Sequence, residues 1–331
     1  WLCMMYPRLK LLQKLLADDG VIFISIDDTE CSNLILICNE IFGASNFVAN
    51  VSWQRTYSPR NDSKGIVSEV EHLVVFSKNP GWQPNKLPRT EAMDSRYKNP
   101  DNDVAPWKSS DAFAPGAATH QGMVYAIQHP FTGEMLYPSN GRCWRYQQSS
   151  MLEYMQGWCN YRLENLHDEK ERARVCGIDE SAVRKDVLAI VLEEPLEVSA
   201  AKAQKVYNRG RWPGFYFTKG GYGGIARKTY LENVGGRLPT NLWMYEETGH
   251  TDEAKKELIS LFGGRSPFDT PKPTRLLDFV LKVAGTSETL MLDSFAGSGT
   301  TAHAVLNANK ADNGNRHFIL IEMMDYADSI T

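Results

Sequence analysis

Two glycines and a carboxylate near the end of the chain have the types and spacing of a nucleotide-type pocket. An apolar run at residues 290–292 predicts a buried strand, and Asp293 follows at the position where a parallel strand would end. Gly297 and Gly299 let the backbone of the next turn approach a ligand without intervening Cβ atoms. Strand ends of this kind form the binding crevice of open α/β sheets.

A second carboxylate is expected to meet the first. Residues 317–321 predict the next strand, and Glu322 closes it, where a carboxylate can accept both hydroxyls of a ribose. Between the two strands, Thr300 and Thr301 are expected to cap a helix with their hydroxyls, and the free N–H groups of its first turn would face the crevice.

Absent residues narrow the choice of ligand. A phosphate-binding P-loop needs a lysine after its second glycine, and Thr300 and Thr301 stand there instead, which argues against ATP. Ala302 fits a dinucleotide fingerprint loosely, so a nicotinamide cofactor stays open. An ordinary βαβ unit with a glycine turn is the other reading.

The stretch Asp-Ser-Phe-Ala-Gly-Ser-Gly-Thr-Thr at 293–301 resembles the S-adenosylmethionine motif of amino-group DNA methyltransferases of the permuted β class. The wider chain resembles the modification subunit of type III restriction-modification systems, through segments at 6–9, 19–28, 249–258 and 268–273. The resemblance implies a Rossmann-like α/β fold, with a mostly parallel doubly wound sheet, permuted motif order and an inserted target-recognition region. It also implies these cofactor-binding residues: Asp293, Phe295, Ala296, Gly297, Ser298, Gly299, Thr300, Glu322, Thr270 and Lys272.

The same resemblance implies methyl transfer from S-adenosylmethionine to the N6 amine of a flipped adenine. Its expected partners are double-stranded DNA, a second copy of the chain and a restriction subunit with helicase and nuclease activity. The family's Asp-Pro-Pro-Tyr tetrad is missing, because the chain contains no Pro-Pro pair. We therefore expect a fragment that lacks its catalytic residues. A DNA-binding specificity module with a vestigial pocket, a cytosine-N4 methyltransferase and a nicotinamide oxidoreductase are the alternatives.

Overall charge, cysteine spacing and the length of the apolar runs argue against a uniformly basic nucleic-acid-binding protein, a zinc protein and a membrane protein. The chain has 331 residues and a net charge of −4, so DNA contacts must come from local patches. Its six cysteines form no Cys-x-x-Cys pair and no zinc-type spacing with histidines, so we expect them to be reduced and buried, and we expect no metal. No apolar run approaches a membrane span, and a cytoplasmic protein without a membrane partner is expected.

The first part of the methyltransferase domain is expected at 1–80. It should contain a helix over 1–17 that becomes regular near Tyr6, a strand at 21–26 covered on both faces, and a helix at 30–42. Strands at 47–54 and 71–78 resemble the antiparallel hairpin that closes a methyltransferase sheet. The connecting loop offers Arg55, Tyr57 and Arg60 to DNA, although a solvated hairpin would look the same.

Linker and loops are expected at 81–139, a DNA-reading region at 140–245, and the second part of the methyltransferase domain at 246–331. Residues 199–231 contain seven basic residues and no acidic one, with aromatic residues and glycines between them. Such a segment suits phosphates and bases, but a solvated basic face over an aromatic core has the same composition. The predicted contacts in this region are Arg142, Trp144, Arg145, Lys202, Lys205, Arg209, Arg211, Lys219, Arg227 and Lys228.

Two further features belong to the last part of the chain. His250 precedes a short helix that Thr251 could cap, and a structural role is the more frequent one for such a histidine. A helix is expected at 274–283, with its first turn preset by the preceding proline.

Overall fold

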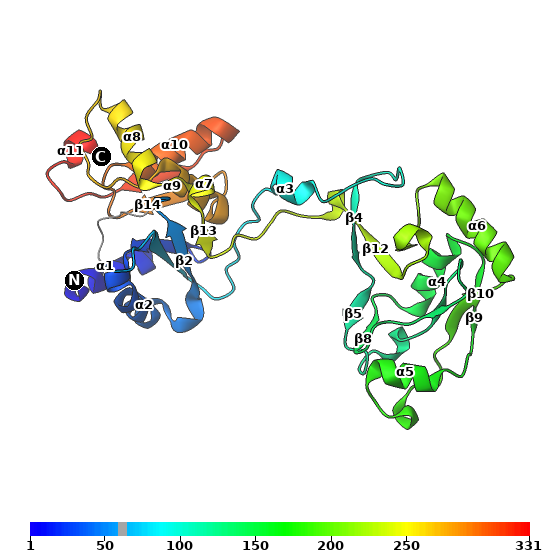
Figure 1. Ribbon diagram of the computed structural model, residues 1–331. Helices are drawn as coiled ribbons and strands as arrows, with labels where there is room; N and C mark the ends of the chain where they lie inside the picture. Colours follow the sequence, from blue (N-terminus) through cyan, green and yellow to red (C-terminus); the bar gives the residue numbers. More distant parts are fainter. Residues whose placement is uncertain (59–64) are drawn as a thin grey trace. The chain divides into compact units, whose positions relative to one another are not determined.

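The computed structural model describes residues 1–58 and 65–331, which divide into two units. We call residues 1–88 with 236–331 the split unit, and residues 89–235 the central unit. The ribbon in Figure 1 shows their helices and strands.

The split unit is built on a four-stranded sheet with the order β1-β3-β2-β13. These strands are β1 (Val21–Ile26), β2 (Phe47–Gln54), β3 (Val70–Ser77) and β13 (Leu242–Trp243). β3 pairs antiparallel with both β1 and β2, and β13 runs parallel to β2. The predicted hairpin at 47–54 and 71–78 is therefore confirmed.

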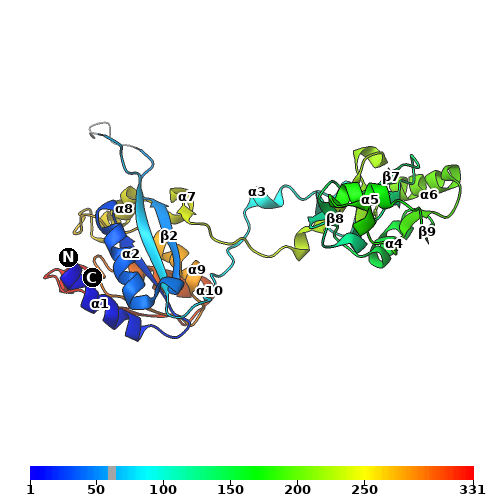
Figure 2. The same cartoon turned by 90° about the horizontal axis from the view of Figure 1, so that it is seen from below.

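Helices cover both faces of this sheet (Figures 1 and 2). Successive side chains of a strand point to opposite faces, and β3 is apolar on both. Val74 and Phe76 pack with α1 (Leu2–Leu15) and α2 (Asp28–Phe42), whereas Leu73 and Val75 pack with α9 (Thr274–Ala284). The result is a three-layer arrangement of helix, sheet and helix.

The expectation of a mostly parallel sheet does not hold for the four-stranded sheet of the split unit. In the four-stranded sheet, only the β2–β13 pair is parallel. A helix followed by an apolar strand predicts a parallel sheet only if the connection to the neighbouring strand crosses over the sheet. Here the β2–β3 hairpin instead places β3 antiparallel beside β1. β1 is consequently an edge strand in the described sheet and is half-buried rather than covered on both faces.

A second, two-stranded parallel sheet carries the glycine turn. β14 (Leu290–Asp293) pairs with β15 (His317–Leu320), and α10 (Thr300–Asp312) connects them. Leu281 of α9 packs with Ala304 and Val305 of α10, which joins this βαβ unit to the helical layer. The remaining helices of the split unit are α7 (Tyr245–Thr248), α8 (Thr251–Leu261) and α11 (Ala327–Ile330).

The predicted helices are present, with different ends. α1 begins at Leu2 with Pro7 inside it, so the expected regular start near Tyr6 is wrong. α2 begins at Asp28 after an Asp27 cap, and α9 matches its prediction closely. Five of the six cysteines are buried, Cys3 is exposed, and all six are free. Within residues 1–58 and 65–331, no helix is long and apolar enough to cross a membrane.

The central unit is a set of short strands and helices around one aromatic core. Its sheets have the orders β11-β12-β4, β7-β6-β10-β9 and β5-β8. The strands are β4 (Trp107–Asp111), β5 (Phe113–Pro115), β6 (Ile127–Gln128), β7 (Met135–Leu136), β8 (Arg142–Trp144), β9 (Tyr161–Glu164), β10 (Ala189–Leu192), β11 (Phe215–Phe217) and β12 (Ile225–Tyr230). The helices are α3 (Glu91–Asp94), α4 (Gln148–Gln156), α5 (Glu169–Cys176) and α6 (Leu196–Arg209).

Much of the predicted linker belongs to this core. Trp107, Tyr125 and Ile127 are buried with Trp158 and Phe215 in a single cluster, so residues 107–136 are not loops outside a domain. The strands between residues 107 and 136 are two to five residues long, and proline and glycine residues occur in and between them. Segments that short show no readable periodicity.

Candidate cofactor crevice and basic surface

The glycine turn lies between the end of β14 and the start of α10. Gly297 and Gly299 have φ values of +54° and +73°, which L side chains rarely adopt. A Cβ atom at Gly297 would lie 3.2 Å from Cζ of Phe268, so the turn also needs glycine for close packing. Ala296 is buried beneath it, and its N–H donates to the carbonyl of Ile321 at 3.2 Å.

Asp293 and Glu322 are brought to this turn, as predicted. The β14–β15 pairing sets Asp293 opposite Leu320, two residues before Glu322. Glu322 Oε2 accepts a hydrogen bond from the Gly297 N–H at 2.9 Å, and its Oε1 accepts from the N–H groups of Met323 and Met324 at 2.8 and 3.0 Å. The hydrogen bond from Gly297 is the largest cause that holds the pKa of Glu322 below its usual value, so this carboxylate is ionised at neutral pH.

The threonines after the turn do not cap the helix. The N-cap of α10 is Gly299, without a side-chain hydrogen bond. Thr301 instead donates to Asp293 Oδ2 at 2.6 Å, while the Phe295 N–H donates to Oδ1 at 3.1 Å. Thr300 donates to the Lys272 carbonyl at 3.2 Å, and Ser298 lies 3.0 Å from its hydroxyl. The expected capping is wrong because both hydroxyls find partners across the turn.

Lys272 links the turn to the four-stranded sheet. Its ammonium group pairs with Glu71 of β3 and lies 5.3 Å from the centroid of the Trp53 ring. Glu71 also accepts a hydrogen bond from Ser25 of β1 at 2.5 Å. Thr270, the other residue predicted here, is exposed and shares the short 268–273 segment with Lys272.

Around the glycine turn lie four residues that were not predicted from the sequence: Arg8, Glu71, Phe268 and Tyr326. Phe295, by contrast, was predicted. Phe295 is 53% exposed, and the Arg8 guanidinium of α1 lies 5.8 Å from its ring centroid. Phe268 packs edge-on against Tyr326, with 5.5 Å between ring centroids. Among these unpredicted residues, only Glu71 has a sequence signal for a site, because it is the one acidic residue in the apolar strand β3. Arg8 and Phe268 come from distant segments, and their positions follow only from packing.

The residues around the glycine turn between Asp293 and Glu322, which we call the crevice residues, fit a nucleoside cofactor. An ionised carboxylate next to backbone N–H groups suits ribose hydroxyls. Gly297 and Gly299 let Phe268 and Thr331 approach the turn, since an added Cβ would lie 3.2 and 3.0 Å from them. An exposed aromatic ring at Phe295 offers a stacking face. In the described ranges, no group of three His, Cys, Asp or Glu side chains is placed to hold a metal ion.

His250 has a structural role, as the sequence indicated. Its Nδ1 accepts a hydrogen bond from the Glu253 N–H at 3.2 Å and thereby caps α8, a role expected of Thr251. Its ring centroid lies 5.0 Å from that of Tyr57. Tyr57 is 55% exposed and Arg55 is exposed, whereas Arg60 lies outside the described residues. Arg55 and Tyr57 thus remain available for the predicted DNA contacts.

Two predicted DNA contacts of the central unit are buried, and we withdraw them. The Lys228 side chain has no exposed surface, and its ammonium lies 2.5 Å from Asp101 Oδ2. Trp144 is 1% exposed and donates its Nε1–H to the Tyr125 carbonyl at 2.8 Å. The basic composition of residues 199–231 predicted an exposed position for Lys228, but β12 turns this side chain inward against acidic residues more than a hundred positions away.

The other predicted basic residues differ in their partners. Arg142 pairs with Asp111 at 3.2 Å, and Lys202 pairs with Glu194 at 2.5 Å. Arg227 is half-buried. Exposed, and without an acidic partner in the part of the chain that the structure describes, are Arg145, Lys205, Arg209, Arg211 and Lys219. Most aromatic residues between them are core residues, which agrees with the reading of a basic face over an aromatic core.

Comparison with known proteins places the chain in a family. The family described as DNA methylase, with N6 and N4 amino-group methyltransferases in its name, matches residues 1–331. The chain belongs to this DNA methylase family. It is 32% identical over 323 residues to the type III restriction-modification enzyme StyLTI Mod subunit of Salmonella typhimurium, covering 97% of the chain and 40% of that protein.

Two further relatives are a second type III modification subunit and a type II methyltransferase. The EcoPI Mod subunit of Escherichia phage P1 is 28% identical over 97% of the chain and 45% of its own length. The type II methyltransferase M.KpnI of Klebsiella pneumoniae is 27% identical over 97% of the chain and 66% of its own length. The chain therefore spans less than half of the type III relatives that it matches.

Proposed function

We propose that this chain is part of a site-specific DNA methyltransferase, the modification subunit of a type III restriction-modification system, and that its split unit binds S-adenosylmethionine. One observation carries the proposal. In a chain of the DNA methylase family, Asp293 and Glu322 flank a glycine turn at the ends of two parallel strands. The type III relatives support the assignment as a modification subunit.

Each residue of the crevice has a role in this proposal. Glu322 would accept the ribose hydroxyls, and Gly297 and Gly299 would let the cofactor lie against the backbone. Thr301 fixes one oxygen of Asp293 at 2.6 Å and leaves that carboxylate in a single orientation. Phe295, Ala296, Ser298 and Thr300 shape the turn. Thr270 and Lys272 would line the methionine end, which the family resemblance implies.

The chemistry of the proposal is methyl transfer to an exocyclic amine, adenine N6 by resemblance. The cofactor supplies a methyl group on a sulfonium, and the protein must hold the amine in line with it. The family's Asp-Pro-Pro-Tyr tetrad is not among the 331 residues. We therefore expect this chain alone to bind cofactor and DNA without transferring a methyl group.

Macromolecular partners complete the proposal. We assign DNA reading to the exposed basic residues of the central unit, with Arg55 and Tyr57 as contacts from the split unit. A restriction subunit and a second copy of the chain are inferred from the type III relatives and the family resemblance.

Titration calorimetry with S-adenosylhomocysteine tests the cofactor site. The wild-type chain should bind, and Asp293→Ala and Glu322→Gln should each weaken binding by about ten- to a hundredfold, because charge-assisted hydrogen bonds are lost. Glu288→Gln is the matched control. Glu288 is an exposed carboxylate before the opposite end of β14, so binding should not change.

Two results would contradict the cofactor assignment. Binding of NAD but not of S-adenosylhomocysteine would favour an oxidoreductase. Absence of binding by a folded wild-type chain that still binds DNA would favour a specificity module with a vestigial crevice.

A further inference from the structure

Two turns of the central unit, one at Asp101 and one at Arg211, are hydrogen-bonded to each other beside Gly210. The Arg211 N–H donates to the Asp101 carbonyl at 2.7 Å, and the Trp212 N–H donates to Asp101 Oδ2 at 2.7 Å. Gly210 has a φ of +78°, and a Cβ there would lie 2.3 Å from the Asp101 carbonyl oxygen. The backbone of residue 210 can approach residue 101 this closely only because it is glycine.

Both turns hold a non-glycine residue in the left-handed region. Asn102 has a φ of +52° and Arg211 a φ of +50°. Such conformations are unfavourable for L residues and persist only where the surroundings enforce them, frequently at functional sites. Here Arg211 Nε also donates to the Asn102 carbonyl, at 3.4 Å, so the two residues are joined directly.

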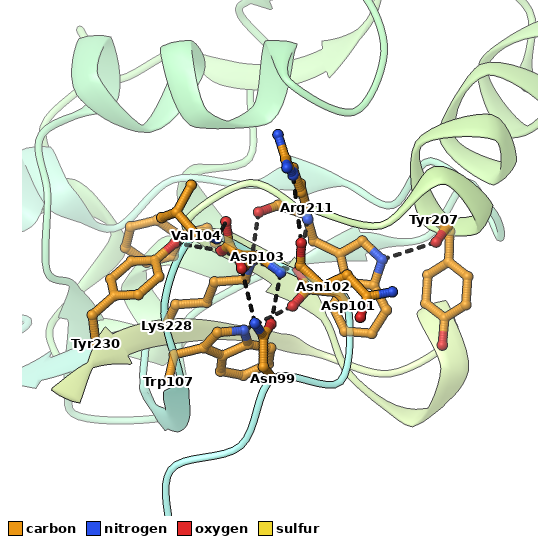
Figure 3. A network of polar contacts seen from close by, with 12 residues as sticks. Asn99, Asp101, Asn102, Asp103, Val104, Trp107, Tyr207, Arg211, Lys228 and Tyr230 are labelled. Atoms are coloured by element: carbon orange, nitrogen blue, oxygen red, sulfur yellow. Dashed lines mark hydrogen bonds and ion pairs between the residues drawn. The ribbon is translucent and has the colours of Figure 1, made fainter.

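A buried ion cluster lies beneath the turns (Figure 3). Lys228 bridges Asp101 and Asp103 and donates to the Trp212 carbonyl at 2.8 Å. Trp107 of β4 donates to Asp101 Oδ1 at 2.8 Å, and Tyr230 of β12 donates to Asp103 Oδ2 at 2.6 Å. The cluster therefore gives the Arg211 backbone a fixed platform.

The Arg211 guanidinium is presented outward from this platform. Figure 3 shows its side chain rising away from the cluster, with Nε donating to the Asn102 carbonyl. Among residues 1–58 and 65–331, its two terminal nitrogens have no hydrogen-bond partner. Arg142, Arg174 and Arg184 of the same unit are each paired with a carboxylate. Across the described ranges, no carboxylate forms an ion pair with Arg211, and residues 198–231 contain no acidic residue.

We propose that Arg211 reads a guanine in the major groove of the target DNA, with its two terminal nitrogens donating to O6 and N7 of that base. This inference rests on the proposed DNA-reading function of the central unit. A planar fork matches the two acceptors of guanine, and holding the fork in advance reduces the freedom lost on binding. Lys205 and Arg209, on flexible stems along α6, suit phosphates, which carry no sequence information.

The test selects bound sequences from random duplex DNA with the full 331-residue chain. Wild type should enrich a motif that contains guanine. Arg211→Lys keeps the charge and loses the fork, so preference at one guanine position should fall roughly ten- to a hundredfold while affinity for unrelated DNA changes little. Arg209→Lys, two residues away, should keep the whole motif. Arg209→Ala removes a proposed phosphate contact, so it should weaken binding to every sequence by the same factor and leave the motif unchanged.

The outcomes separate this inference from the proposed function. If Arg211→Lys enriches the same motif as wild type, Arg211 does not read a base, whereas DNA recognition by the chain stands. If the wild-type chain enriches no sequence, the proposed DNA reading fails first and the role of Arg211 fails with it. Unchanged melting midpoints of both Arg211→Lys and Arg209→Lys confirm that the comparison concerns contacts rather than folding.

Discussion

At the residue scale, Lys228 shows how burial decides the role of a charge. It was predicted to contact DNA, yet it balances two buried carboxylates. We expect Lys228→Met to destabilise the central unit by about 3–5 kcal/mol, because Asp101 and Asp103 would be left as uncompensated buried charges. Urea unfolding followed by tryptophan fluorescence would measure the loss.

The pH dependence of this variant follows from the carboxylates. Burial raises the pKa of Asp103, but hydrogen bonds from Lys228, Tyr230 and the Val104 N–H outweigh it, and the net pKa is lowered. In wild type, the stability from Asp103 is present above the ordinary aspartate pKa and is lost as pH falls through the lowered value. Without Lys228 the pKa of Asp103 must rise, so Lys228→Met should cost more stability at pH 7 than at pH 3, which is below the ordinary aspartate pKa. An equal loss at both pH values would refute this account.

Lys205→Met provides the control for Lys228→Met. Lys205 is an exposed lysine on α6. Its substitution should change stability by no more than about 0.5 kcal/mol. A loss comparable to that of Lys228→Met would mean that removal of any lysine, rather than of a buried counter-charge, explains the result.

At the scale of elements, the turn between β14 and α10 combines two separable constraints. Gly297 and Gly263 have φ values of +54° and +64°, but only Gly297 has a neighbour within 4 Å of an added Cβ. Gly263→Ala should therefore cost about 1 kcal/mol through backbone strain alone. Gly297→Ala should cost about 1–3 kcal/mol more, because the methyl group would press on Phe268.

A double-mutant cycle with Phe268→Ala measures the part that comes from contact. The extra cost of Gly297→Ala should fall when the Phe268 ring is removed, since the introduced methyl group would press on that ring. Strict additivity of the two substitutions would show that backbone strain, not packing, makes glycine necessary at this turn.

The same scale explains what the sequence could and could not predict. The strand, glycine turn, helix and second strand from 290 to 322 follow from local pattern, and their parallel pairing is confirmed. Capping by Thr300 and Thr301 failed because their partners, Lys272 and Asp293, become near neighbours only in the folded chain. The parallel sheet failed for a related reason: strand order depends on long-range pairing, which apolar runs do not encode.

At the scale of the whole molecule, the chain contains two units with separate cores. Trp53, Leu276 and Phe279 belong to a core of the split unit, whereas Trp158 and Phe215 belong to that of the central unit. The residues that we propose for cofactor binding all lie in the first, and Arg211 lies in the second. The sequence predicted the first part of the methyltransferase domain to end at residue 80 and the DNA-reading region to begin at 140, whereas the two units divide between Pro88 and Arg89.

Separate cores predict separate unfolding. A ligand stabilises only the cooperative unit to which it binds, because binding shifts the equilibrium of that unit alone. Differential scanning calorimetry of the 331-residue chain should resolve two transitions, and S-adenosylhomocysteine at a hundred times its dissociation constant should stabilise one by about 2.7 kcal/mol. Lys228→Met should lower the other transition and leave the ligand-sensitive one in place. If one transition responds to both the ligand and the substitution, the units unfold together, and cofactor binding is coupled to the region that we propose reads DNA.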